Sequence, residues 1–243
     1  MTVVHELTAV YSRRRFACLF FSLLITMVAA PVLGAMGLGT RFIEIFLGLN
    51  ILAAVLVTVF SFGTHLGVGL LLLLAVSRAG HALLGQGLLL DTSLGVGVVI
   101  CLLAIGIMLR LILSEGSVTS ERIFAALDVY LLVGVTCGLL FCVFEEMWPG
   151  SFSFQGSTFA ETKQSPLAHT IYFSFVTLGT LGYGDIIPVG GPVRALAVAE
   201  AMIGQMYLVV IVARLVSLYK GKAERNDGNT RDEATHADDI PQP

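Results

Sequence analysis

The stretch Thr177-Leu178-Gly179-Thr180-Leu181-Gly182-Tyr183-Gly184-Asp185 decides how this sequence folds. Glycines stand at two alternate positions, and glycine adopts the left-handed backbone angles that let successive carbonyls face one side. The stretch lies between two long apolar runs, so we expect it at membrane depth. Non-helical backbone is tolerated there only where protein buries it or where it lines a watery path. The sequence therefore predicts a strand of inward-facing carbonyl oxygens.

A short helix is predicted immediately before this strand. Ser165 is a suitable N-cap, and Pro166 suits the first helical position. The apolar run 167–178 is too short to cross a bilayer but suits a re-entrant half-helix. Its C-terminal end carries partial negative charge and would point into the membrane, where it stabilises a cation.

Together these features resemble the pore of the potassium channel family, whose motif is Thr-x-x-Thr-x-Gly-Tyr-Gly-Asp. The resemblance covers about residues 123–219. It implies a homotetramer, because one strand per chain needs four chains to close rings of ligands. It implies that K⁺ is coordinated by the filter residues, with the Thr180 hydroxyl as the innermost ligand. These residues are Thr180, Leu181, Gly182, Tyr183 and Gly184.

Some side chains around the strand differ from the family pattern, and others are expected to support the strand. Leu181 replaces the commoner valine, and Gly179 replaces a threonine common at the end of the pore helix. Tyr172 stands where many members have tryptophan, and we predict that its hydroxyl bonds Asp185. The alternative is that Asp185 is solvated in the outer mouth. Thr177, Tyr172 and Asp185 are therefore the expected supports of the filter.

The span after the strand is expected to line the pore. Gly204 falls where the family often has a hinge, although close helix packing is the alternative. One helical stripe joins Gln205, Leu208, Val212 and Val216. Gln205 would face a hydrated ion, while Val212 and Val216 would form a hydrophobic gate. The alternative places this stripe against the preceding span.

Three ionisable side chains lie within the flanking spans. Asp128 and Arg214 are predicted at similar depth near the cytoplasm, where they pair within or between subunits and bias the gate. The alternative is that each snorkels separately. Glu200 lies behind the filter, protonated or hydrogen-bonded.

The composition independently indicates an all-α membrane protein. The 243 residues are 56% hydrophobic and only 13% charged, which excludes a soluble enzyme. The four cysteines lie in apolar runs, which favours small buried side chains over a disulfide or metal site. Six membrane spans are predicted, at 16–39, 42–62, 66–84, 93–113, 123–144 and 193–219, in addition to the re-entrant helix.

The charge pattern predicts the orientation and the domain plan. Three arginines at 13–15 favour a cytoplasmic N-terminus, and six crossings return the C-terminus to the same side. A cleaved twin-arginine signal is the alternative for this end. We expect a cytoplasmic N-terminus (1–15), a four-span membrane domain (16–113), a pore domain (123–219) and a disordered cytoplasmic tail (220–243).

These observations predict a potassium-selective channel subunit of the cell membrane rather than an enzyme. Arg110 is the only basic residue of the fourth span, so strong voltage gating is not expected. The expected partners are further copies of the chain, the lipid bilayer and K⁺, with no nucleic acid and no cofactor. A potassium-uptake transporter subunit and a less selective cation channel are the alternatives. The gating stimulus and the role of the first four spans stay open.

Overall fold

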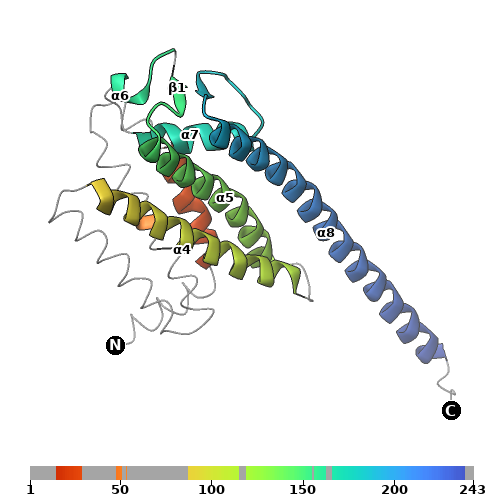
Figure 1. Cartoon of the computed structure of the whole chain (residues 1–243). Helices are drawn as coiled ribbons and strands as arrows, with labels where there is room; N and C mark the ends of the chain where they lie inside the picture. The colour runs from red at the N-terminus through yellow and green to blue at the C-terminus, as the bar shows by residue number, and fades with distance from the viewer. Residues whose placement is uncertain are drawn as a thin grey trace, which may run out of the picture.

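The computed structural model describes residues 15–28, 48–50, 53, 87–114, 119–154, 156–162 and 166–238, and these are mostly helical (Figure 1). Among these described residues, three helices are long and apolar enough to cross a membrane, which are α4 (Gly87–Leu113), α5 (Ser120–Met147) and α8 (Gly191–Asp238). They correspond to the predicted fourth, fifth and sixth spans. A shorter apolar helix, Arg15–Val28, falls on the first. The predicted second and third spans lie almost entirely outside the described residues.

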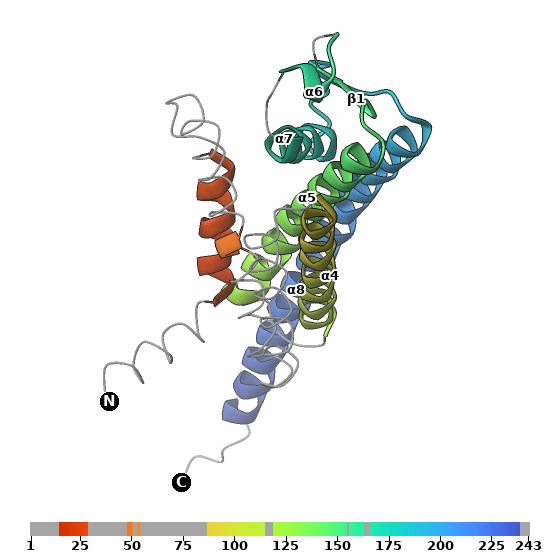
Figure 2. The ribbon, with the colours of Figure 1, turned by 60° about the vertical axis from the view of Figure 1, so that its left-hand side comes forward.

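Helix α5 is the centre of the structure. It begins one turn before the predicted span because Thr119 caps it, with its side chain accepting from the Arg122 N–H. The main core joins α4 to α5 through fully buried side chains, among them Ile100 and Met108 from α4 and Leu132 from α5. The first apolar helix also reaches this core, through Phe16 and Leu19 (Figure 2).

Small residues on α5 let the short helix α7 (Pro166–Leu178) approach closely. A Cβ atom at Gly134 would lie 2.7 Å from the Phe175 ring, and one at Gly138 would lie 2.7 Å from the Ile171 Cα. Neither position has room for a side chain. The predicted half-helix therefore forms at the expected residues and packs across α5.

The outer loop is closed by a two-stranded antiparallel sheet. Strand β1 (Phe152–Phe154) pairs with β2 (Ile186–Pro188), and the short helix α6 (Phe159–Thr162) follows β1. Buried Glu145, near the end of α5, accepts the backbone N–H groups of Gly150 and Phe152, each at 3.0 Å. This carboxylate holds the loop on top of α5, so the chain returns in a defined position after the filter strand.

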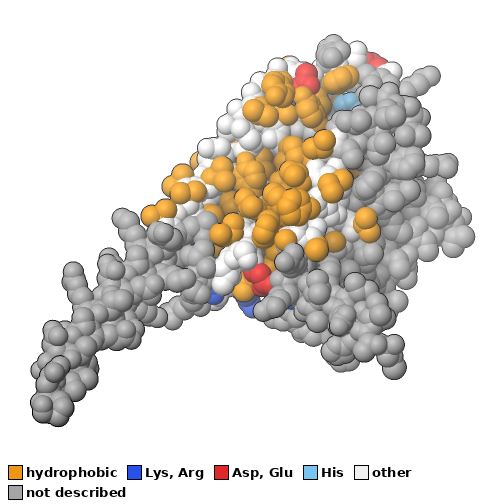
Figure 3. All heavy atoms as spheres, turned by 180° about the vertical axis from the view of Figure 1, so that it is seen from behind, with side chains coloured by type: hydrophobic (Ala, Val, Ile, Leu, Met, Phe, Trp, Pro, Cys, Tyr) orange, Lys and Arg blue, Asp and Glu red, His pale blue; other side chains and the backbone are white. Residues whose placement is uncertain are grey.

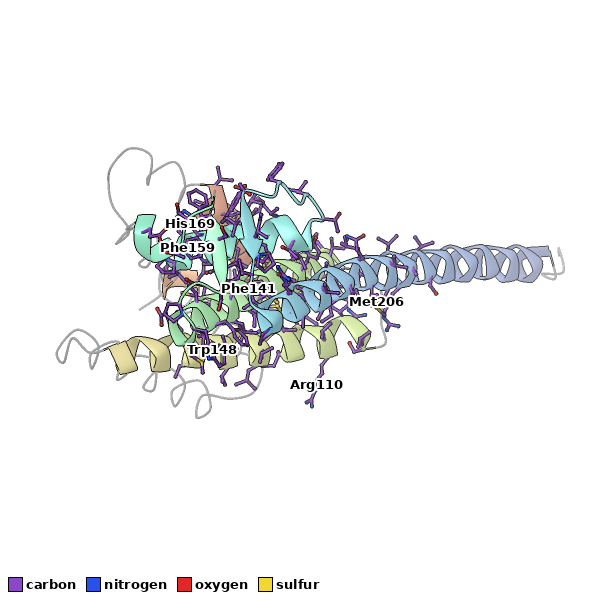
Figure 4. All side chains as sticks on the ribbon, turned by 45° about the horizontal axis from the view of Figure 1, so that its top comes forward. Arg110, Phe141, Trp148, Phe159, His169 and Met206 are labelled. Carbon is purple, nitrogen blue, oxygen red and sulfur yellow. The ribbon has the colours of Figure 1, made fainter. Side chains whose placement is uncertain are left out.

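Aromatic side chains fill the space under this loop. The Phe152 ring lies 5.6 Å from that of Phe141 and 5.1 Å from that of Phe173, both edge-on. Such edge-to-face contacts add stability beyond their buried area. The His169 ring touches the Phe159 ring at 5.2 Å, and Figure 4 shows these two together at the loop end.

Helix α8 is longer than expected. The sequence predicts a disordered tail from Lys220, but the helix continues without a break to Asp238, well away from the other helices (Figure 1). No proline occurs between Pro192 and Pro241, and alanine, lysine, glutamate and arginine between 219 and 225 favour the helix. The hydrogen-bonded backbone therefore extends beyond the apolar span.

Candidate functional site

The predicted filter segment, residues 179–185, leaves α7 through a hydrogen-bonded turn. The N–H of Gly179 donates to Phe175 O, that of Thr180 to Thr177 O and that of Leu181 to Val176 O, at 2.9–3.0 Å. These bonds use carbonyls in the last turn of α7, which a helix end leaves free. Thr177 thus supports the segment through its backbone oxygen.

Residues at alternate positions of this segment adopt positive φ. The values are 54° at Thr180, 58° at Gly182 and 76° at Gly184. A Cβ atom added at either glycine would have no neighbour within 4 Å, so the backbone angle rather than a lack of space favours glycine here. Thr180 is the one non-glycine residue with positive φ among the described residues. Such strain costs on the order of 1–3 kcal/mol and clusters at functional sites.

The filter segment is open on one side within a single chain. Leu181 and Tyr183 are 58% and 66% exposed, although the helices behind them are closely packed. A large exposed leucine beside an exposed tyrosine is unusual unless another surface covers them. The segment therefore has an exposed face within the single chain.

The predicted bond at the outer end of the filter is present. The Tyr172 hydroxyl donates to Asp185 Oδ2 at 2.9 Å, across the turn between α7 and β2. Partial burial, followed by this hydrogen bond and the charge of Asp185, raises the pKa of the Tyr172 phenol. Tyrosine therefore stays a neutral donor throughout the physiological range.

Two tyrosines that sequence reasoning missed support the inner end of the filter. Tyr130 of α5 donates its hydroxyl to Leu178 O at 3.1 Å, the last carbonyl of α7. Tyr207 of α8 stacks on Tyr130, with ring centroids 6.4 Å apart, and donates to Ala126 O at 2.7 Å. A tyrosine inside an apolar span is the signal that could have found them, because its hydroxyl needs a partner there.

Gly204 lies where α8 crosses the end of α7. A Cβ atom there would be 2.6 Å from Leu178 Cδ1 and 3.2 Å from Leu178 O. Leu178 is fully buried and cannot easily move aside. Close packing therefore accounts for this glycine, and its role as a hinge stays a prediction.

The predicted pore-lining stripe is exposed on α8. Its members are Gln205, Leu208, Val212 and Val216, whereas Gly204 and Ile211 on the neighbouring face are buried. Within one chain the stripe therefore does not pack on α5, and its position at the pore axis stays a prediction. Other apolar side chains of α8 are exposed as well, and Figure 3 shows hydrophobic side chains gathered on one face of the molecule.

The predicted pair of Asp128 and Arg214 does not form within the chain. The Arg214 guanidinium instead donates to the carbonyls that end α4, at 2.6 Å to Leu113 O and 3.3 Å to Ile112 O. These carbonyls lack helical partners and carry partial negative charge, so they attract a cation. Asp128 is fully buried, and neither of its oxygens has a hydrogen-bond partner in the described part of the chain. Pairing between subunits stays a prediction.

Glu200 has partners that the sequence did not identify. Its Oε1 is hydrogen-bonded to the Ser174 hydroxyl of α7, which also lies 2.6 Å from Gly134 O of α5. The sequence signal that could have predicted this contact is a serine within a mostly apolar helix, because its hydroxyl needs a partner. No cluster of metal-ligand side chains occurs in the described ranges.

A comparison with known families matches residues 126–220 to the ion channel family. The matched segment begins in α5, contains α7 and the predicted filter residues 179–185, and ends in α8. Over these residues the chain is similar to ion channels, and its relatives include proteins named as potassium channels. The matched segment contains the contacts described above, apart from those that Arg214 makes with the end of α4.

Relatives of the matched segment occur in plants and bacteria. It is 32% identical over 94 residues to two pore potassium channel c of Oryza sativa subsp. japonica, covering 39% of this chain and 18% of that protein. It is 33% identical over 67 residues to two-pore potassium channel 4 of Arabidopsis thaliana, covering 28% of this chain and 24% of that protein. Protein LctB of Bacillus caldotenax is 27% identical over 96 residues, covering 40% and 71%. The chain thus spans under a quarter of each plant relative. No solved structure matches it.

Proposed function

We propose that this chain is a subunit of a potassium-selective channel that conducts K⁺ passively. The observation that carries the proposal is the alternation of positive φ at Thr180, Gly182 and Gly184 directly after the half-helix α7. Alternating backbone angles turn successive carbonyls toward one side, where they form a ladder of oxygen ligands. The potassium channel relatives of the segment support the choice of ion.

The chemistry of conduction follows from this ladder. K⁺ sheds its hydration water only where oxygens replace it, and carbonyl dipoles do so without a fixed charge that would trap the ion. The ligands are the carbonyls of residues 180–184 together with the Thr180 hydroxyl. The C-terminal end of α7 would stabilise a hydrated ion below them. No cofactor and no covalent step is needed.

Four copies of the chain complete the pore. One filter strand supplies one quarter of each ring, and the exposed Leu181 and Tyr183 are left for neighbouring copies to cover. The apolar span of α8 is only 22% buried, against 56% for α5. This surface includes Val198, Met202, Met206 and Val209, each at least 60% exposed, and Figure 4 shows Met206 pointing outward. Part of it would contact other copies and part would contact lipid.

The remaining features describe how the channel sits in the membrane and opens. It lies in the cell membrane with six spans and both termini cytoplasmic. The stripe of Gln205, Leu208, Val212 and Val216 faces the central axis, where the two valines gate by excluding water. Gly204 adds bending freedom at the point where α8 crosses α7.

Reconstitution of the purified chain in planar bilayers tests this function. With K⁺ and Na⁺ on opposite sides, we expect the current to reverse near the potassium equilibrium potential. Gly182→Ala is the matched variant, because it blocks the positive φ without crowding any neighbour. It should lose selectivity while retaining assembly.

Other outcomes would contradict the proposed function. A reversal potential near zero in the wild-type protein would indicate a less selective cation channel. Turnover coupled to proton movement would indicate a potassium-uptake transporter instead.

A further inference from the structure

One buried hydroxyl behind the filter joins three helices. Ser174 Oγ of α7 is hydrogen-bonded to Glu200 Oε1 of α8 and lies 2.6 Å from Gly134 O of α5. Ser174 is fully buried, and Glu200 is 1% exposed within the single chain. Neighbouring copies therefore cannot supply further partners, and contacts within the chain must satisfy these groups.

The number of protons available for hydrogen bonding indicates the protonation state of Glu200. A serine hydroxyl carries one proton, and the Gly134 carbonyl can only accept. If Glu200 were a carboxylate, Ser174 would face two acceptors with a single proton to share. If Glu200 is protonated, its hydroxyl donates to Ser174 Oγ, and Ser174 donates to Gly134 O. Only the protonated acid gives each contact its own hydrogen bond.

The surroundings of Glu200 also disfavour a charge. Tyr130 and Cys137 of α5 are the titratable groups that face it, and Ser174 is its neighbour on α7. No lysine, arginine or histidine of the described residues interacts with it. Its second oxygen, Oε2, has no hydrogen bond of ordinary geometry, although the Cys137 thiol is a further weak donor to this carboxyl group. A buried carboxylate without a counter-charge is costly, whereas a neutral acid beside a weak donor is tolerated.

We propose that Glu200 is a neutral carboxylic acid in the assembled protein and that it positions the filter. The chain of hydrogen bonds runs from Glu200 of α8 through Ser174 of α7 to Gly134 of α5. Ser174 directly precedes Phe175 and Val176, whose carbonyls hold the first residues of the filter segment. Glu200 thus acts through α7 and touches no ion. Its positioning role rests on the proposed function, but its protonation state does not.

Infrared difference spectroscopy of the full chain in lipid tests the protonation state. Subtracting the Glu200→Gln spectrum from the wild type at neutral pH should reveal the C=O stretch of a carboxylic acid. Glu161→Gln is the matched control, because Glu161 is exposed on the outer loop and should remove only carboxylate bands. Carboxylate bands alone in the Glu200 difference spectrum would overturn the proposal.

A second variant reports on the same hydrogen bond from its other side. Ser174→Ala leaves Glu200 in place but removes the acceptor of its proton. The carboxylic acid band should then shift to higher frequency, because its hydrogen bond is lost. An unshifted band in Ser174→Ala would overturn the proposed hydrogen bond from Glu200 to Ser174, even if Glu200→Gln failed to assemble.

Single-channel recording tests the positioning role. Ser174→Ala and Glu200→Ala should each lower the open probability about fivefold, the factor that one net hydrogen bond supplies. Glu200→Gln should restore it, since an amide N–H can donate to Ser174 as the acid does. An equal loss in Gln and Ala variants would overturn this role. Loss of selectivity in the wild type would instead overturn the proposed function and leave the infrared result standing.

Discussion

Individual residues around the filter carry strain or relieve it. Thr180 holds a left-handed backbone angle that a threonine rarely adopts, so its neighbours must compensate for the cost. The bond between Tyr172 and Asp185 supports the outer end, and the Tyr130 hydroxyl supports the carbonyl of Leu178 at the inner end. These contacts fall on both sides of the strained strand, so each should affect how long the strand keeps its shape.

Tyr172→Phe removes the outer bond and leaves the ring in place. We expect the filter to close about fivefold faster during sustained activation, because one net hydrogen bond contributes about 1 kcal/mol. The measurement is the inactivation time course of the reconstituted channel. Asp185→Asn is the partner variant, and the double variant should be no faster than Tyr172→Phe alone. Unchanged kinetics in Tyr172→Phe would show that the bond does not hold the filter.

Among the elements, α8 contacts the other helices at several points. Gly204 lets it touch the end of α7, and Arg214 binds the carbonyls that end α4. Between these points Tyr207 bonds the backbone of α5. The inner helix is therefore attached to every other long helix that the structure describes.

Gly204→Ala tests whether this glycine serves packing or bending. Its Cβ atom would lie 2.6 Å from Leu178 Cδ1, and overpacking of this kind costs about 1–3 kcal/mol. We therefore expect lower thermal stability of the assembled protein in detergent. Gly95→Ala is the matched control, because no atom lies within 4 Å of the added Cβ. Altered gating with full stability would instead favour the hinge.

Arg214→Gln tests the contact between α8 and α4. Its loss leaves the last carbonyls of α4 without this donor, which should destabilise the contact by about 1 kcal/mol. Hydrogen exchange of the amides near residue 112 should then speed up. Arg214→Lys keeps the charge but not the fork of donors, so it should restore protection only in part. Full protection in Arg214→Gln would contradict this role.

At the scale of the whole molecule, burial differs among the long helices that the structure describes. The α5 span is 56% buried, against 39% for the α4 span and 22% for the α8 span. Arg110 on α4 points away from the other helices in Figure 4. The described residues of α4 thus present one arginine rather than a row that could move through the membrane field.

A shallow response to voltage follows from this arrangement. One charge crossing a potential of 100 mV changes the free energy by only about 2.3 kcal/mol, too little for a steep switch. The conductance of the purified channel should therefore vary weakly with voltage, and Arg110→Gln should leave the curve in place. A steep conductance–voltage relation would contradict this prediction.

Much of this arrangement could be predicted because it is local in the chain. The apolar runs of the fourth to sixth spans, the cap-like start of α7 and the glycines at 182 and 184 each act within a few residues. The Tyr172 bond was predicted from the resemblance to the potassium channel family, and its partners lie 13 positions apart across one turn. The tail from Lys220 was predicted to be disordered, whereas helix α8 runs on to Asp238.

The sequence by itself determined a membrane protein with a half-helix, a glycine-dependent strand and a pore motif. Only the tertiary structure decided which polar groups meet inside it. Arg214 binds the end of α4 rather than Asp128, and Glu200 meets Ser174. The physical reason is that a buried polar group forms hydrogen bonds with the groups that packing places next to it. These partners are 26 and 101 positions apart in the chain, so local sequence pattern does not identify them.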